Sequence, residues 1–112
     1  MILRSRPTRQ FSAEMLSIYR YIASDNPDAA ERFFAAVEHC IQRLTVFPRI
    51  GRLWDTNKPA LEGMRVYSVE PYRVYQIFYR VVGKDLEVYR IVHGARDLKR
   101  FVNEIEFDTD DD

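Results

Sequence analysis

Residues 72–82 of this 112-residue chain, YRVYQIFYRVV in one-letter code, decide its fold. β-Branched and aromatic side chains occupy both the odd and the even positions, so both faces of the expected strand are apolar. A strand with two apolar faces belongs at the centre of a sheet that is covered on both sides. The flanking residues 64–69 and 86–92 also have strand character, and residues 83–85 predict a hairpin turn.

The last of these strands alternates in a way that predicts which side chains share a face. One face is expected to carry Leu86, Val88, Arg90 and Val92, and the other Glu87, Tyr89, Ile91 and His93. Tyr89 and His93 would then lie on the same face of the sheet, roughly 13 Å apart along the strand.

Two helices precede the strands. Apolar residues at helical spacing follow Thr8 and Ser12, either of which can cap the first helix with its hydroxyl group. Asn26 is a natural N-cap, and Pro27 suits the first position of a second helix that we expect to end at about residue 46. The tight joint between the two helices predicts an antiparallel helical hairpin.

The expected core includes Phe33, Phe34 and Phe47, which are large and apolar. The single cysteine, Cys40, lies on the apolar stripe of the second helix, so we expect it to be buried and unreactive. Trp54 falls in an irregular segment, where it either packs onto the domain or anchors an interface.

These elements predict an α+β fold. A short N-terminal strand at residues 2–6 precedes a helical hairpin that packs on a small antiparallel β-sheet, and a short amphipathic C-terminal helix follows at residues 95–107. Residues 1–107 form a single domain in this interpretation. Residues 108–112 contain four aspartates, which predict an acidic tail that frays.

The composition excludes several classes of protein. Hydrophobic residues make up 46% of the chain and charged residues 30%, which excludes a disordered or low-complexity segment. One cysteine excludes an internal disulfide and a cysteine-based zinc cluster, and a reducing, cytoplasmic location is the default. Because the sequence has neither a long apolar run nor a metal-ligand cluster, we expect no membrane span, no metal and no other cofactor.

Charge is distributed unevenly along the chain. There are 17 basic and 17 acidic residues, but four of the acids lie in the last five positions. The rest of the chain, which we call the body, is therefore cationic and rich in arginine. Such a body suits an acidic partner or nucleic acid, or it is simply a solvated surface.

Several short strings in a fixed order carry a family resemblance. They lie at residues 26–33, 44–48 with 51–52, 63–65, 77–81 and 92–98. Together they resemble the ParE branch of the ParE/RelE superfamily of bacterial toxins from type II toxin–antitoxin modules. The resemblance extends over nearly the whole chain, and its most specific strings are residues 78–81 and 93–97.

The resemblance implies a small toxin that arrests bacterial growth when its antitoxin is lost. ParE-like members poison DNA gyrase by trapping it on cleaved DNA, whereas RelE-like members share the fold and cut mRNA in the ribosome. The implied partner is a cognate antitoxin whose amphipathic C-terminal segment folds on the toxin, so a hetero-oligomer is expected.

A metal-independent ribonuclease needs an acid, a base and cations that stabilise the phosphate. The residues that could supply them are Arg65, Arg90, His93 and Tyr89, of which Arg65 resembles the phosphate-contacting arginine of the ribonuclease branch. Ribonuclease members carry clustered lysines or an aromatic residue after the histidine, whereas here Gly94 follows His93 and the three lysines are scattered. These departures favour a gyrase poison and leave the ribonuclease as the alternative, with an inactive toxin or another interaction module also open.

A gyrase poison needs a binding surface rather than catalytic residues. The candidate target-binding residues are Trp54, Arg65, Arg96, Lys99, Arg100 and Phe101. Simpler roles are open for two residues near the end of the last strand: His93 can hydrogen-bond a backbone carbonyl, and Asp97 can cap the C-terminal helix.

Overall fold

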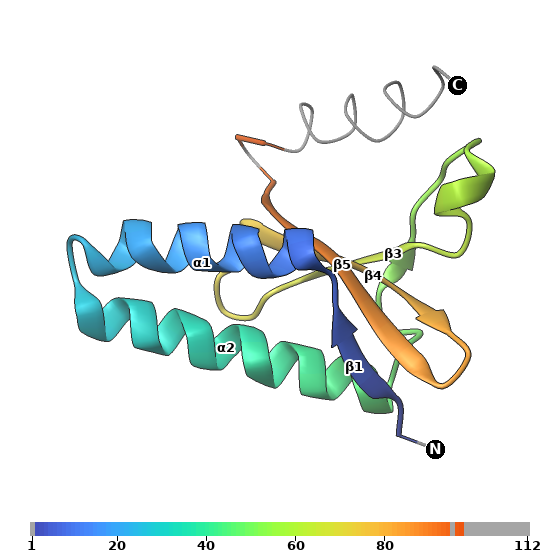
Figure 1. Ribbon diagram of the computed structural model, residues 1–112, viewed down its shortest axis with the longest axis horizontal. Coiled ribbons are helices and arrows are strands. Elements are labelled where there is room, and N and C mark those ends of the chain that lie inside the picture. The colour runs from blue at the N-terminus through green and yellow to red at the C-terminus, as the bar shows by residue number, and fades with distance from the viewer. Residues whose placement is uncertain (1, 95, 98–112) are drawn as a thin grey trace.

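The computed structural model describes residues 2–94, 96 and 97, and these form a helical hairpin and a five-stranded sheet (Figure 1). In chain order the elements are β1 (Arg4–Pro7), α1 (Arg9–Ala23), α2 (Pro27–Val46), β2 (Arg52–Leu53), a short 3-10 helix η1 (Pro59–Leu61), β3 (Arg65–Ser68), β4 (Tyr75–Val82) and β5 (Asp85–His93). The two helices lie side by side and cover one face of the sheet. The predicted α+β fold and helical hairpin are confirmed.

The strand order in the sheet is β1-β5-β4-β3-β2, which places β4 at the centre as the sequence predicts. Neighbouring strands from β2 to β5 are antiparallel. The N-terminal strand departs from the predicted antiparallel sheet, because β1 pairs in parallel with β5 and the sheet is therefore mixed. The two-residue strand β2 has no counterpart among the predicted strands, since two residues are too few to produce a periodic pattern.

The middle of β4 is covered on both faces. Ile77, Phe78 and Tyr79 are all fully buried. Ile77 and Tyr79 pack in the larger core cluster, which includes buried residues of both helices. Phe78 packs in a second cluster, together with Leu61, Met64, Val66 and Val92. The prediction of a central strand with two apolar faces is confirmed for this stretch.

Both helices begin where the sequence predicts. The Thr8 hydroxyl accepts a hydrogen bond from the Phe11 amide at 3.0 Å, so Thr8 and not Ser12 is the N-cap of α1. The Asn26 side chain accepts from the Ala29 amide at 3.1 Å, and Pro27 occupies the first turn of α2. Each cap satisfies an amide that the helix itself leaves without a partner.

The prediction that three phenylalanines lie in the core is correct only for Phe33. Phe33 is buried, whereas Phe34 is 43% exposed and Phe47 is 57% exposed. The inward stripe of α2 runs through Ala30, Phe33 and Val37, and Phe34 lies one position to its side. Phe47 is the C-cap residue, so it lies beyond the part of α2 that packs on the sheet.

A β-bulge interrupts the pairing of β4 with β5. Phe78 pairs with Arg90, but the next β4 residue, Tyr79, pairs with Val88. Tyr89 is therefore an extra residue in β5 with no partner across the strand pair.

The bulge overturns the predicted alternation of β5. Beyond it, Ile91 packs with Leu86 in the cluster under the helices, whereas Val92 packs with Tyr89 in the opposite cluster. The sequence pattern assigns these residues the other way round, because an inserted residue changes the parity of every side chain that follows it. The predicted C-terminal helix at 95–107 and the acidic tail at 108–112 lie outside the described residues, apart from Arg96 and Asp97.

Tyr79 connects the sheet to the loop that follows α2. Its buried hydroxyl group donates to the Pro48 carbonyl at 2.6 Å and accepts from the Gly51 amide at 3.0 Å. Burial raises the pKa of Tyr79, which keeps the hydroxyl protonated and able to donate. Gly51 lies so close that an added Cβ atom would be 2.4 Å from the Tyr79 hydroxyl oxygen and 2.9 Å from the Val66 carbonyl oxygen.

We predict that Gly51→Ala lowers the free energy of unfolding by about 1–3 kcal/mol, because the new methyl group meets a buried ring and fixed backbone. Tyr79→Phe should lower the free energy of unfolding by a similar amount, because it leaves the Gly51 amide without its hydrogen-bond partner. Urea denaturation of both variants checks this. The matched control is Arg52→Ala, an exposed neighbour that should change stability by less than about 0.5 kcal/mol. Wild-type stability of Gly51→Ala would contradict the prediction.

Candidate functional site

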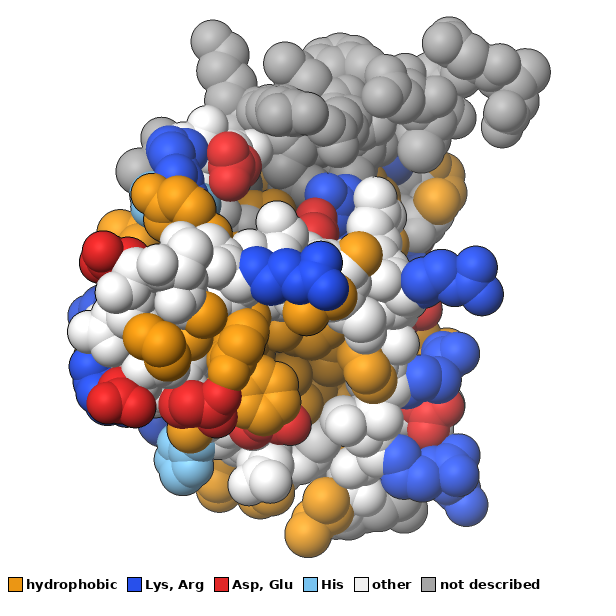
Figure 2. Space-filling model, turned by 60° about the vertical axis from the view of Figure 1, so that its left-hand side comes forward, with side chains coloured by type: hydrophobic (Ala, Val, Ile, Leu, Met, Phe, Trp, Pro, Cys, Tyr) orange, Lys and Arg blue, Asp and Glu red, His pale blue; other side chains and the backbone are white. Residues whose placement is uncertain are grey.

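An apolar groove of about 610 Å³ lies between α1, α2 and β1. Its apolar lining includes Phe11, Met15, Leu16, Phe34, Val37 and Ile41. Leu16 and Phe34 are 48% and 43% exposed. Figure 2 shows the hollow as a continuous apolar surface. Exposed apolar side chains that border a hollow make this groove a candidate site for another molecule.

Charged side chains border this groove unevenly. Glu31 and Glu38 line it on the α2 side, and Tyr19 of α1 donates a hydrogen bond to Glu31 across the helical hairpin. That hydrogen bond raises the pKa of Tyr19. The opposite wall includes Ser5 and Pro7 of β1, which is an edge strand of the sheet. In Figure 2, acidic side chains lie along one border of the hollow and Lys or Arg side chains lie beyond the other.

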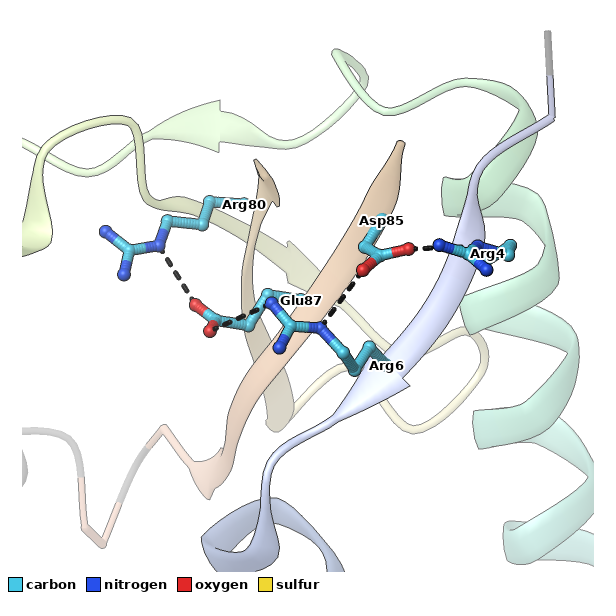
Figure 3. A network of polar contacts seen from close by, with 5 residues as sticks. All are labelled: Arg4, Arg6, Arg80, Asp85 and Glu87. Atoms are coloured by element: carbon cyan, nitrogen blue, oxygen red, sulfur yellow. Dashed lines mark hydrogen bonds and ion pairs between the residues drawn. The ribbon is translucent and has the colours of Figure 1, made fainter. Parts of the chain in front are cut away.

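Five charged residues alternate in sign across β1, β5 and β4 (Figure 3). Arg4 and Arg6 contact the two carboxylate oxygens of Asp85 at 3.1 and 3.3 Å. Arg6 also lies 3.9 Å from Glu87, which accepts a hydrogen bond from Arg80 at 2.9 Å. The three arginines thus share two carboxylates. These ion pairs connect β1 to β5 and β4, in addition to the backbone pairing of β1 with β5.

Arg65, a candidate for both predicted functions, lies on β3 beside the loop after α2. Its Nη1 atom donates to the Gly51 carbonyl at 2.7 Å and to the Arg49 carbonyl at 3.4 Å. Neither Arg49 nor Arg65 forms an ion pair with a described carboxylate. The Arg65 guanidinium is therefore held in place by backbone carbonyls that leave its charge without a counterion among the described residues.

Arg90 is buried and pairs with Glu14 of α1 at 2.5 Å. The other carboxylate oxygen of Glu14 accepts from the Ile91 amide at 3.1 Å. Glu14 thus accepts a hydrogen bond from the backbone of β5 beyond the point where β5 pairs with β1, since that pairing ends at Pro7. Glu14 is not among the residues that the sequence predicts for the site, because nothing in the local pattern shows that α1 crosses β5.

His93 lies at the end of β5. Its ring packs edge-on against Tyr75, with a centroid distance of 5.1 Å, and its Nδ1 atom accepts from the Arg96 amide at 3.2 Å. The described hydrogen bond of this ring is thus to a backbone amide, whereas the sequence-based expectation is a backbone carbonyl. A candidate acid–base group is here used to shape the turn that follows the strand.

Tyr89 and Trp54 both pack against the second core cluster, around Phe78. The Trp54 and Phe78 rings lie 5.2 Å apart in an edge-to-face arrangement, so Trp54 packs onto the domain. Tyr89 and His93 contact different clusters, which contradicts their predicted placement on one face.

Of the four residues considered for ribonuclease chemistry, Arg90 and His93 line one pocket of about 440 Å³, whereas neither Arg65 nor Tyr89 lines it. Arg65 and His93 lie on β3 and β5, and their partners on β4, Tyr79 and Tyr75, are four residues or roughly 13 Å apart. Of the candidate target-binding residues, Trp54, Arg65 and Arg96 are described, whereas Lys99, Arg100 and Phe101 lie outside the described residues.

Neither a metal site nor a membrane span is found in residues 2–94, 96 and 97. No group of three or more His, Cys, Asp or Glu side chains in this part could hold a metal ion. Neither of its two α-helices combines the length and apolar character that crossing a membrane requires.

Comparison with known families and proteins gives a consistent result. Residues 6–98 match the family model described as the ParE toxin of type II toxin-antitoxin system, parDE. The chain is 31% identical over 98 residues to Toxin ParE3 of Caulobacter vibrioides, a match that covers 87% of this chain and 89% of that protein. It is 32% identical over 74 residues to Toxin ParE1 of Mycobacterium tuberculosis, covering 65% and 69% of the two chains.

Among solved structures, the chain is similar to one described as a chromosomal ParDE TA system from P. aeruginosa. The TM-score is 0.65 with 22% sequence identity, and the match covers 82% of this chain and 96% of the other. At this level of identity the likeness establishes the fold alone.

The burial of Cys40 can be tested through the reactivity of its thiol. The residue is buried as predicted, and desolvation raises the pKa of its thiol from 9.0 to about 11. Because only the thiolate is nucleophilic, we predict that Cys40 of the folded protein reacts with a disulfide reagent at pH 8 at least about tenfold more slowly than in the urea-unfolded chain. The chain has one cysteine, so the signal is unambiguous. Equal rates in the two states would contradict the prediction.

Proposed function

Because the chain belongs to the ParE toxin family of type II toxin–antitoxin systems, we propose that it arrests bacterial growth by binding DNA gyrase and holding it on cleaved DNA. A cognate antitoxin would neutralise it by occupying the toxin surface. The proposal assigns no catalytic residue to the toxin, which would act as a binding wedge in the cytoplasm. A metal-independent ribonuclease is the competing function within the same fold.

The observation that carries the choice is the separation of Arg65 and Tyr89 from Arg90 and His93, which line one pocket. Metal-free cleavage needs acid, base and phosphate-stabilising groups within reach of one phosphate. Here Arg90 is engaged by Glu14, and Arg65 and His93 lie on strands separated by β4. A binding function does not require these groups to converge, so the geometry favours the gyrase poison.

The apolar groove supports the antitoxin part of the proposal. Its dimensions and exposed side chains suit an amphipathic helix, which would place apolar residues against Leu16 and Phe34. The edge strand β1 lies beside it and offers backbone groups to an extended segment. Removing such a segment would return a large apolar surface to water.

Pulse labelling after induction without antitoxin tests the target. We expect thymidine incorporation to fall before methionine incorporation, and the purified toxin to trap gyrase on cleaved plasmid DNA. A matched culture that expresses the toxin together with its antitoxin controls for the effects of expression. If methionine incorporation fell first and gyrase were unaffected, the ribonuclease would be the better assignment, and Arg65 and His93 would be the residues to substitute.

A second experiment tests the groove. We predict that Phe34→Asp weakens antitoxin binding at least about tenfold, because it places a charge at an apolar contact beside Glu31 and Glu38. Titration calorimetry with the purified antitoxin measures the change. The control is Tyr21→Asp, since Tyr21 is an exposed aromatic residue of α1 that is not part of the groove lining. Unchanged affinity of Phe34→Asp would remove the groove from the antitoxin site.

A further inference from the structure

A second recess lies on the described surface, apart from the apolar groove. It has a volume of about 360 Å³ and is lined by Leu3, Pro48, Arg49, Gly63, Arg65 and Val81. None of these residues lines the groove. The lining of the recess comes from the N-terminal segment, the loop after α2, Gly63, the start of β3 and the end of β4. Backbone hydrogen bonds of 3.0 Å join this N-terminal segment to the end of α2 and to the turn between β4 and β5, and Figure 1 shows the three segments near one another. We call these six residues the arginine recess.

Several exposed apolar side chains line the arginine recess or lie next to its lining residues. Val81, which lines it, is 46% exposed. Phe47 and Ile50 flank the lining residues Pro48 and Arg49 in the chain and are 57% and 40% exposed. Leu53 pairs with Arg65 in the sheet and is also exposed. Exposed apolar residues next to two cations are typical of a protein interface rather than of a surface that contacts nucleic acid backbone.

The two arginines give the recess an uncompensated positive charge. Its six lining residues include no carboxylate, and neither Arg49 nor Arg65 has an ion pair with a described residue. Arg65 uses only Nη1 in its described hydrogen bonds, which leaves Nε–H and Nη2 without a protein partner among the described residues. A guanidinium in this state matches the planar, two-point geometry of a carboxylate.

The recess is also rigid. Arg65 holds the Gly51 carbonyl, and the Tyr79 hydroxyl holds the Gly51 amide and the Pro48 carbonyl. The loop that carries Arg49 is thereby fixed to β3 and β4 before any partner binds. Preorganisation of this kind lowers the entropic cost of association.

From these observations we infer that the arginine recess is the surface that contacts the toxin's target, and that it receives an acidic side chain of a protein flanked by apolar residues. This inference rests on the proposed function for the identity of the target, DNA gyrase. The exposed apolar side chains at the recess would pack against the protein around the inserted carboxylate, and Arg49 and Arg65 would pair with it.

Arg49→Glu tests the inference, because Arg49 is exposed and its side chain has no described contact that folding needs. We expect this variant to bind purified gyrase at least about tenfold more weakly than the wild type and to lose growth arrest in parallel. Arg49→Gln removes the charge without reversing it, so this variant should lose less gyrase affinity than Arg49→Glu. The matched control is Arg32→Glu on the exposed side of α2, outside both the recess and the groove, and it should bind within about twofold of the wild type. Thermal melting of each variant verifies the fold.

The outcomes separate the inference from the proposed function. If the wild type binds gyrase and Arg49→Glu binds equally well, the inference is overturned and the proposed function stands. If the wild type arrests growth without binding gyrase, the proposed function fails. The inference about the recess is then tested by comparing the growth arrest that the variants cause. Loss of arrest by Arg49→Glu but not by Arg32→Glu would support the recess, and retained arrest would overturn it. Binding of DNA alone that depends on Arg49 would replace the acidic protein by a phosphate and would also overturn the inference.

Discussion

Three consecutive residues at the centre of β4 must all be kept from water, and the rest of the molecule follows from that constraint. Ile77, Phe78 and Tyr79 point alternately to the two faces of the sheet and are fully buried. The helical hairpin covers one face. On the other face Trp54 packs on Phe78, and Arg80 donates to the Ala60 carbonyl at 2.8 Å, so the irregular segment is held down by an aromatic contact and a hydrogen bond.

Tyr79 extends this constraint from the core to the surface. Its ring belongs to the cluster under the helices, but its hydroxyl reaches the loop after α2 and bonds two of its backbone groups. Without a side chain at Gly51 the loop can approach the ring closely. The position of Arg49, and with it one wall of the arginine recess, is thus set by a core residue of the central strand. The surface proposed to contact a partner is here built directly on the most buried part of the fold.

The sequence predicts the parts of this fold that depend on local chemistry. Asn26 and Pro27 define the start of α2, and the continuous apolar run in β4 defines the centre of the sheet. Residues whose role depends on distant neighbours are not predictable in this way. Phe33 and Phe34 are equally apolar, and only the packing angle of α2 decides that Phe34 lines a groove instead of the core. The sequence pattern likewise gives no sign of the bulge at Tyr89.

The candidate site shows the same division. Arg65 is selected by its residue type and by a family resemblance, but its hydrogen bonds to the Gly51 and Arg49 carbonyls depend on a loop that is fixed by Tyr79. Glu14 cannot be selected at all without knowing that α1 crosses the end of β5. Chemistry-bearing residues are thus identifiable from sequence, whereas their partners, which decide what each residue does, are determined by tertiary packing.

The positions of the two surfaces bear on how a toxin of this kind can be neutralised. Ser5 and Pro7 line the apolar groove, whereas Leu3, in the segment that leads into the same strand, lines the arginine recess. Two residues of extended chain span roughly 7 Å, so a segment bound in the groove beside β1 needs only a few more residues to reach the recess. An acidic residue in that continuation would meet Arg49 and Arg65, the charges that we propose for contact with the target. Neutralisation would then follow from direct competition at the recess, with the groove supplying the apolar binding energy, and no conformational change in the toxin is needed.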